Sequence, residues 1–247
     1  MKIPESHPRY ESLRQRERMV KALEEGYLAT AGLIAHGRGE AFDYLVGEKT
    51  LEPAEMAEKV GVGLLLLAEH PVISVNGNTA ALAAKEIVEL SGILNAKLEV
   101  NLFYRTLERE MIIKRVLKEN GASEVLGVGN DASERIPGLD SERGRVDPGG
   151  IWKADVVLVP LEDGDRTEAL VEMGKKVIAI DLNPLSRTSQ RADVTIVDNV
   201  VRAIPNMVSF AGEMKNIGAK ELKNLIQGFD NKKNLNEMLG AIYGNLR

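Results

Sequence analysis

The sequence lacks cysteine and has few aromatic residues and few histidines. Its 247 residues include no cysteine, and aromatic side chains make up only 4% of them. The absence of cysteine excludes disulfides, thiolate nucleophiles and cysteine-ligated zinc. The three histidines are His7, His36 and His70, and they form neither a Ser-His-Asp order nor a metal-binding spacing. Hydrolase and zinc chemistry are therefore excluded, and no side chain is assigned as a metal ligand.

Long apolar runs and an excess of basic residues are also missing. The longest apolar run, GLLLLA at 63–68, is too short to span a bilayer, and the N-terminal residues contain no apolar signal core. The net charge of -5 argues against broad nucleic-acid binding. We predict a cytoplasmic protein that binds neither membranes nor nucleic acids.

What is present indicates a globular α/β protein. Short, β-branched apolar runs, which predict strands buried on both faces, occur at 72–75, 98–103, 125–128, 155–160, 176–181 and 194–197. Helical patterns occur at 9–25, 53–69, 79–91, 105–119, 166–174, 204–215, 219–227 and 231–243. Alternating strands and helices predict a parallel sheet flanked by helices. We expect a single domain over 1–247, with a helical N-terminal extension to about 70 and C-terminal helices from about 203.

The residues after each strand carry the functional information, because ligands of open α/β sheets bind outside the carboxyl ends of the strands. Asn76, Gly77, Asn78 and Thr79 follow one strand and begin a helix, whose free N–H groups suit a phosphate or carboxylate. A tight turn with a helix cap explains the same four residues equally well.

A second strand end, GVGNDA at 127–132, matches the dinucleotide fingerprint G-x-G-x-x-A. Pro137, Gly138, Gly144 and Pro148 lie where the fingerprint requires a helix, so we interpret the segment as a mobile loop. Its arginines, Arg135, Arg143 and Arg145, are then available to an anionic ligand. A solvated surface loop is the alternative.

The third strand end is the segment DLNPLSRTSQRADVTIVDN at 181–199. An acid at a strand tip, here Asp181, is placed to accept hydrogen bonds from ribose hydroxyls. Asn183 offers an amide to a base or ribose, and Arg187 and Thr188 offer donors to a polyphosphate. Asp198 and Asn199 repeat the pattern after the next strand. Together these residues favour nucleotide binding.

The segment LIAHGRGEAFDYLVGEKT at 33–50 is interpreted as a glycine-rich turn between helices. It has no Walker lysine, but Arg38 between two glycines is expected to approach a ligand closely. His36 is either a proton carrier or phosphate donor, or a structural residue. Glu40 or Asp43 could bind magnesium, although no spacing requires it.

Four blocks resemble one family. IPESHPRYESLRQRER, GLIAHGRGEAFDYLVGEKT, PVISVNGNTAAL and IDLNPLSRTSQRADVTIVDNVVRAIPNM closely resemble archaeal phosphopantothenate synthetase, also called 4-phosphopantoate–β-alanine ligase. The resemblance implies a Rossmann-like subunit in a homodimer. It also implies condensation of 4-phosphopantoate with β-alanine in coenzyme A biosynthesis, with ATP converted to AMP and diphosphate through an acyl-adenylate.

The resemblance also implies the positions of the site. The nucleotide-binding residues carried over from the family are Arg16, Arg38, Asp181, Leu182, Asn183, Arg187, Thr188, Asn199 and Val200. By elimination, Asn76, Gly77, Asn78 and Thr79 are expected to bind phosphopantoate. Arg38 and His36 are the candidate catalytic residues, and Mg²⁺ is expected to accompany ATP. An NAD-dependent oxidoreductase and a nucleotide sensor without catalysis are the alternatives.

Overall fold

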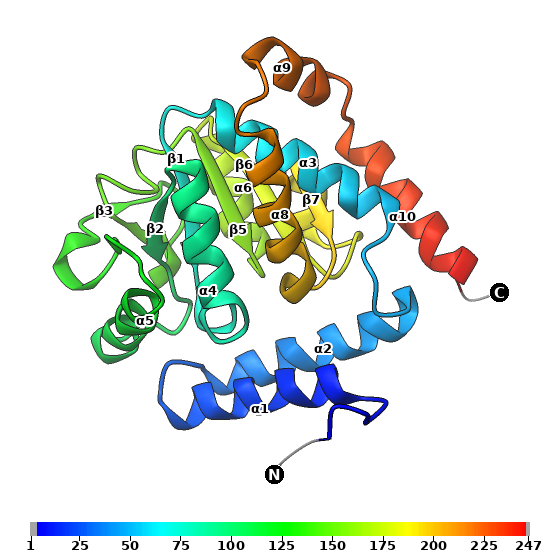
Figure 1. Cartoon of the computed structure of the whole chain (residues 1–247). Coiled ribbons are helices and arrows are strands. Elements are labelled where there is room, and N and C mark those ends of the chain that lie inside the picture. The colour runs from blue at the N-terminus through cyan, green and yellow to red at the C-terminus, as the bar shows by residue number, and fades with distance from the viewer. Residues whose placement is uncertain (1–3, 246–247) are drawn as a thin grey trace.

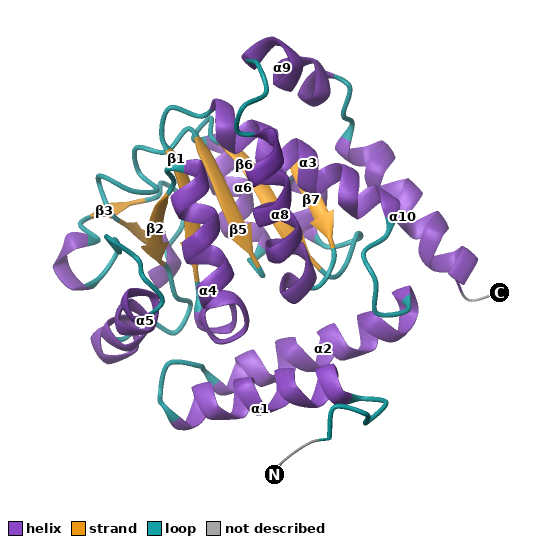
Figure 2. Cartoon of the chain, in the orientation of Figure 1, coloured by secondary structure: helices purple, strands orange, loops and turns teal. Residues whose placement is uncertain are grey.

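A five-stranded parallel sheet forms the centre of the molecule. The computed structural model describes residues 4–245. The strands are β1 (Pro71–Val75), β2 (Lys97–Val100), β5 (Val156–Pro160), β6 (Lys176–Asp181) and β7 (Val194–Val197). They pair in the order β2-β1-β5-β6-β7, with all neighbours parallel (Figure 2). The predicted parallel α/β architecture is confirmed.

Helices connect successive strands and form the C-terminal part of the chain. The connecting helices are α4 (Gly77–Leu94), α5 (Leu107–Glu119), α6 (Gly164–Glu172) and α7 (Arg187–Arg191). After β7 the chain ends in α8 (Val200–Met214), α9 (Ala219–Gln227) and α10 (Asn231–Asn245). The order of the strands reverses between β1 and β5, which makes this pair the topological switch point of the sheet.

The sheet separates two cores because successive side chains of a strand point to opposite faces. On one face, Ile73 and Leu158 pack with α3 (Glu52–Leu67), α4 and α8. On the other face, Val72 and Val157 pack against α6 and the segment that follows α5. Neighbouring strands bury their apolar residues in register, for example Ile73 beside Leu98. The buried runs in the sequence therefore correspond to central strands.

Two helices at the N-terminus form an arm beside the carboxyl edge of the sheet. They are α1 (Tyr10–Glu24) and α2 (Thr30–Val46), which lie side by side in Figure 1 below the strand ends. The helix α2 also contacts α10 and α4. The prediction of a glycine-rich turn at 33–50 is wrong, since most of this stretch is helix α2.

The helix forms because its buried residues lie on one face. Gly32, Gly39, Phe42 and Val46 recur at helical spacing and are buried, whereas Gly37 is exposed. Glycine weakens an isolated helix by about 1 kcal/mol per residue, but packing of a buried face outweighs that preference.

The predicted strand at 125–128 is also wrong. Only one parallel bridge forms there, between Glu99 and Leu126. Gly127 then adopts φ +75°, where a Cβ would lie 2.6 Å from the carbonyl oxygen of Val100, so pairing ends after one residue. The segment continues as short turns and a two-stranded ladder of β3 (Glu134–Arg135) and β4 (Arg145–Val146). None of the helices within residues 4–245 is long and apolar enough to cross a membrane.

Candidate functional site

At the switch point between β1 and β5, helix α4 begins directly after β1 with a capped N-terminus. Asn76 follows β1 and caps α4, because its Oδ1 accepts hydrogen bonds from the Thr79 backbone N–H at 3.0 Å and the Thr79 hydroxyl at 2.9 Å. Its amide donates to the carbonyl oxygen of Pro160 at the end of β5, at 2.9 Å. These bonds join the two strand ends. They leave the first N–H groups of α4, those of Gly77 and Asn78, without an intrahelical partner.

The side chain of Asn78, unlike its backbone N–H, makes a structural contact within the protein. Its amide donates to the carbonyl oxygen of Gly32 at 2.9 Å and joins α4 to the start of α2. Gly32 is required there, since a Cβ would lie 2.6 Å from Asn78 Oδ1. Asn78 therefore offers a ligand its backbone, while its side chain positions the arm.

A cavity of about 310 Å³ opens in front of this helix terminus. Gly77 and Asn78 line it, together with three arginines from three segments, Arg38 of α2, Arg109 of α5 and Arg143. Arg143 is ion-paired with Glu162 and with Asp163, whose Oδ2 lies 3.1 Å from Arg143 Nε. Burial lowers the pKa of Arg143 to about 10, so it stays protonated at neutral pH. The cavity has the character of an anion site.

A second cavity of about 610 Å³ lies at the ends of β5 and β6. Most of its polar lining comes from the strand end after β6 and the start of α7, with Arg38 of α2 and Glu162 after β5, and most of its apolar lining comes from α2 and α10. The residues are Asp181, Leu182, Asn183, Arg187 and Thr188 on one side and Ala35, Phe42, Leu45, Leu239 and Ile242 on the other. The structure thus brings together six of the residues expected at a nucleotide site, these five and Arg38, and it adds an apolar wall.

Asp181 is held rigidly at the tip of β6. It accepts a hydrogen bond from the Ser186 hydroxyl at 2.6 Å and one from the Asn183 backbone N–H at 3.0 Å. Burial raises the pKa of Asp181, while these hydrogen bonds and the positive charge of Arg38 oppose that rise. The carboxylate is fixed in direction and close enough to Arg38 to feel its charge.

Arg38 lies where the two cavities meet. Both are lined by Ala35, Arg38, Leu161 and Glu162. Glu162 is already paired with Arg143 and Arg166, whereas the side chain of Arg38 is exposed and forms no hydrogen bond or ion pair within residues 4–245. The backbone of Leu161 is left-handed, with φ +55°, a conformation that non-glycine residues adopt mainly where function or packing demands it.

Arg187 and Thr188 begin α7 at the rim of the larger cavity. Arg187 is exposed and pairs with Asp165 and Glu168 of α6. Thr188 is buried, and its hydroxyl donates to the carbonyl oxygen of Glu162 at 3.1 Å. Arg187 therefore places a cation at the cavity edge, while Thr188 joins the two strand ends.

Asn199 and Val200 do not line either cavity. Both are buried at the start of α8, where Asn199 donates through its amide to Asp43 Oδ2 of α2 at 3.1 Å. Arg202 of α8 also donates to Asp43, at 2.7 Å. These contacts fasten α2 to the start of α8.

Arg16 and His36 also lie outside the two cavities, so the structure does not bring His36 together with Arg38 in either of them. Residues two apart on a helix are separated by about 200° around its axis, so they face opposite sides. His36 lines a small cavity against α1, and burial lowers its pKa. Arg16 donates to Glu40 Oε2 at 3.1 Å on that same side.

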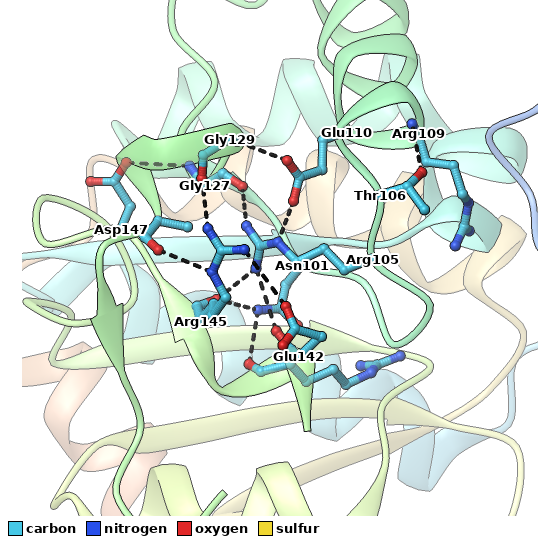
Figure 3. A network of polar contacts seen from close by, with 12 residues as sticks. Asn101, Arg105, Thr106, Arg109, Glu110, Gly127, Gly129, Glu142, Arg145 and Asp147 are labelled. Atoms are coloured by element: carbon cyan, nitrogen blue, oxygen red, sulfur yellow. Dashed lines mark hydrogen bonds and ion pairs between the residues drawn. The ribbon is translucent and has the colours of Figure 1, made fainter. Parts of the chain in front are cut away.

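The segment after α5 is held by a network around Arg105, shown in Figure 3. Arg105 pairs with Glu110 and donates to the carbonyl oxygens of Gly127 at 2.6 Å and Arg145 at 2.9 Å. Arg145 donates to the carbonyl oxygen of Gly129, also at 2.9 Å. Arg135, Arg143 and Arg145, which the sequence offered to an anionic ligand, all donate to carbonyl or carboxylate oxygens of the protein, and of the three only Arg143 lines the smaller cavity.

Glu162 and Arg109 are two of the cavity residues that the sequence patterns did not indicate. Glu162 follows β5 in PLEDGD, and the same strand-end argument that selected Asp181 would have found it. Arg109 lies in an ordinary amphipathic helix, and no local pattern distinguishes it from Arg115. Only the packing of α5 beside the start of α4 brings Arg109 into the site.

The fold and the cavities together define a parallel α/β protein with two adjoining polar cavities at the carboxyl ends of its strands, one at the switch point between β1 and β5 and one at the ends of β5 and β6. Residues 53–245 match the phosphopantothenate/pantothenate synthetase family, and the chain belongs to that family. The resemblance in the sequence blocks is thereby confirmed.

Three relatives are similar in sequence to this chain over nearly its whole length. A 4-phosphopantoate–β-alanine ligase of Thermococcus kodakarensis is 60% identical over 238 residues, which cover 96% of this chain and 90% of the relative. A ligase of the same name from Thermococcus onnurineus is 60% identical over 240 residues, 97% of this chain and 91% of the relative. That of Methanosarcina mazei is 55% identical over 245 residues, with 99% and 96% covered.

Proposed function

We propose that this chain is an ATP-dependent ligase that joins 4-phosphopantoate to β-alanine and releases 4'-phosphopantothenate, AMP and diphosphate. The observation that carries the proposal is the pair of cavities that share Arg38, one with a strand-end acid and an apolar wall, the other with a helix N-terminus. The names of relatives at 55–60% identity support the same substrates.

The larger cavity suits the nucleotide. Asp181 and Asn183 would bind ribose or adenine, and the apolar residues Phe42 and Ile242 would cover the base. Arg187 would exchange its surface carboxylates for the triphosphate, since a charge-assisted bond to phosphate is stronger than an exposed ion pair.

The smaller cavity suits 4-phosphopantoate. Its phosphate would accept hydrogen bonds from the N–H groups of Gly77 and Asn78, with Asn76 and Thr79 holding that helix terminus in place. The carboxylate would then lie toward Arg38 and the larger cavity.

The chemistry follows from a carboxylate being a poor acyl donor. A carboxylate oxygen attacks the α-phosphorus of ATP, and the bond to the diphosphate leaving group breaks. The β-alanine amine then attacks the acyl carbon of the adenylate, AMP leaves, and the amine loses a proton to form the amide. Arg38 would offset the negative charge where the two anions meet.

Magnesium is expected to accompany ATP in this reaction. Within residues 4–245 no cluster of three acidic or histidine side chains is placed to hold a metal ion. The phosphate oxygens and water would therefore supply most of its ligands, as is usual for Mg²⁺ bound with a nucleotide.

The remaining assignments rest on the family. Arg16, Asn199 and Val200 stay predicted nucleotide-binding positions outside the two cavities, and His36 has no catalytic role in this proposal. We also propose a cytoplasmic homodimer acting in coenzyme A biosynthesis. Light scattering coupled to size exclusion tests the dimer, and a monomer at micromolar concentration would contradict it.

One assay tests the reaction. The protein is incubated with ATP, Mg²⁺, 4-phosphopantoate and β-alanine, with each component omitted in turn, and AMP and 4'-phosphopantothenate are quantified. AMP in stoichiometric turnover only in the complete mixture supports the ligase. Turnover of NAD would instead support an oxidoreductase, and nucleotide binding without AMP would support a sensor.

A further inference from the structure

We propose that Arg109 of α5 binds the phosphate group of the acid substrate and selects 4-phosphopantoate over pantoate. This inference rests on the proposed function and names a residue that the carried-over positions do not include. It follows from the charge, contacts and position of Arg109.

The charge of Arg109 is uncompensated within residues 4–245. Its Nη2 donates to the carbonyl oxygen of Tyr27 at 3.0 Å and its Nη1 to that of Tyr104, while its Nε is buried without a hydrogen-bond partner. No carboxylate of the described chain lies within ion-pair distance, and burial lowers the pKa of Arg109 without an acidic neighbour to oppose it. A half-buried cation in this state favours an anion from outside the chain.

The guanidinium lies beside the start of α4. A Cβ built on Gly77 would be 3.3 Å from Arg109 Nη2, and both residues line the smaller cavity. The N–H groups of Gly77 and Asn78, in the first turn of α4 ahead of a kink at Ala83, have no intrahelical partner, so they and Arg109 can act on the same anion. A phosphate monoester carries close to two negative charges at neutral pH and matches this pair of features.

The other arginines of the smaller cavity indicate how 4-phosphopantoate is oriented in it. Arg143 is compensated by Glu162 and Asp163. Arg38 forms no ion pair within residues 4–245 but lies near Asp181 and lines both cavities, whereas Arg109 lines only the smaller one. We therefore place the phosphate of 4-phosphopantoate at Arg109 and its carboxylate at Arg38, beside the larger cavity that is assigned to the nucleotide.

Figure 3 distinguishes Arg109 from its structural neighbours. Arg105 and Arg145 point into the network that holds the segment after α5, and they donate to carbonyl oxygens there. Arg109 starts from the same region, where its backbone N–H donates to Thr106 Oγ1 at 3.3 Å, but its guanidinium points away from the network. Arg109 is therefore placed to act in the smaller cavity and not in the network around Arg105.

The test compares the two acids in Arg109→Met, which keeps the apolar stem and removes the charge. We expect KM for 4-phosphopantoate to rise about 10- to 100-fold, and the selectivity in kcat/KM for 4-phosphopantoate over pantoate to fall by the same factor. The KM values for ATP and β-alanine should stay within about twofold. Arg115→Met, on the exposed side of α5, is the matched control and should change none of these values.

A second variant keeps the test decisive if Arg109→Met does not fold. Arg109→Lys retains the charge but loses the planar fork, so KM for 4-phosphopantoate should rise about 3- to 10-fold with the fold intact. An unchanged KM in the folded variant, or an equal loss with both acids, would overturn the role of Arg109. Failure of the wild-type protein to form AMP would instead overturn the proposed function, so the two failures are distinct.

Discussion

Arg38 illustrates how a residue can be identified correctly within a wrong local structure. Its two flanking glycines suggested a turn, yet it projects from a helix toward the ends of β5 and β6. The neighbour chosen with it, His36, belongs to the opposite side of that helix. The chemistry of a residue type is visible in the sequence, but the direction of the side chain depends on the local backbone.

Arg38→Ala should lower turnover by two or more orders of magnitude. Removing a cation from the junction of two anions withdraws charge compensation where the reaction occurs. Because Arg38 is exposed and has no partner within residues 4–245, the free energy of unfolding should change little. Steady-state kinetics and denaturant unfolding measure both quantities, with Arg115→Ala as the control. Near-normal turnover would remove Arg38 from the mechanism.

Asp181→Ala should raise KM for ATP by about 10-fold or more and change KM for β-alanine little. The carboxylate is oriented by Ser186 and the Asn183 backbone, so its loss removes a preorganised acceptor for a ribose hydroxyl. Asp181→Asn, which keeps the shape and one acceptor, should have an intermediate effect. A raised KM for β-alanine with an unchanged KM for ATP would contradict the ribose assignment.

At the scale of elements, the central strands were the most predictable features, because strands buried on both faces are written as continuous apolar runs. The run at 125–128 has the same composition but forms a single bridge, since Gly127 turns the chain away. In α2 the glycines indicated a turn, but the segment is a helix because it packs against α4 and α10.

The helical state of α2 predicts opposite effects for two of its glycines. A Cβ added at Gly37 would meet no atom within 4 Å, so Gly37→Ala should stabilise the protein by about 0.5–1 kcal/mol through helix propensity. At Gly32 a Cβ would lie 2.6 Å from both Asn78 Oδ1 and Leu28 Cδ1, so Gly32→Ala should destabilise by about 1–3 kcal/mol. Guanidinium unfolding measures both, and equal effects would contradict the observed helix packing.

At the scale of the whole molecule, a buried polar network joins the loop after α2, α3 and α8. Glu58 of α3 is fully buried and accepts a hydrogen bond from Asn206 of α8 at 3.2 Å. Asn206 also donates to Thr50 at 3.0 Å, and Thr50 donates to Asp198 at 2.6 Å. Burial, with the nearby charge of Asp198, raises the pKa of Glu58 to about 9.

This network predicts a pH dependence of global stability. Between the ordinary pKa of 4.5 and about 9, the folded state keeps a proton on Glu58 that the unfolded state releases, so its contribution to stability falls as pH rises. Glu58→Gln should remove that slope and stabilise the protein at pH 7 by about 2–3 kcal/mol. Unfolding free energies at pH 5, 7 and 9 measure the effect.

The control for this prediction is Glu55→Gln on the same helix, where the carboxylate is exposed and pairs with Lys59. That variant should keep the fall in stability between pH 5 and 9, because burial and the charge of Asp198 raise the pKa of Glu58 more than Glu55 does. Parallel pH profiles for the wild-type protein and Glu58→Gln would show that Glu58 is ionised in the folded state.

The sequence by itself determined the parallel α/β class, the family and the strand-end residues Asp181, Asn183 and Asn76 to Thr79. These features depend on local periodicity and on residue types next to strand ends, which a chain carries without its fold. Only the tertiary structure decided that Arg38 joins two cavities, that His36 faces away, and that Arg109 reaches the start of α4. Those facts depend on how helices pack across long separations in the sequence, where burial and close approach outweigh local preference.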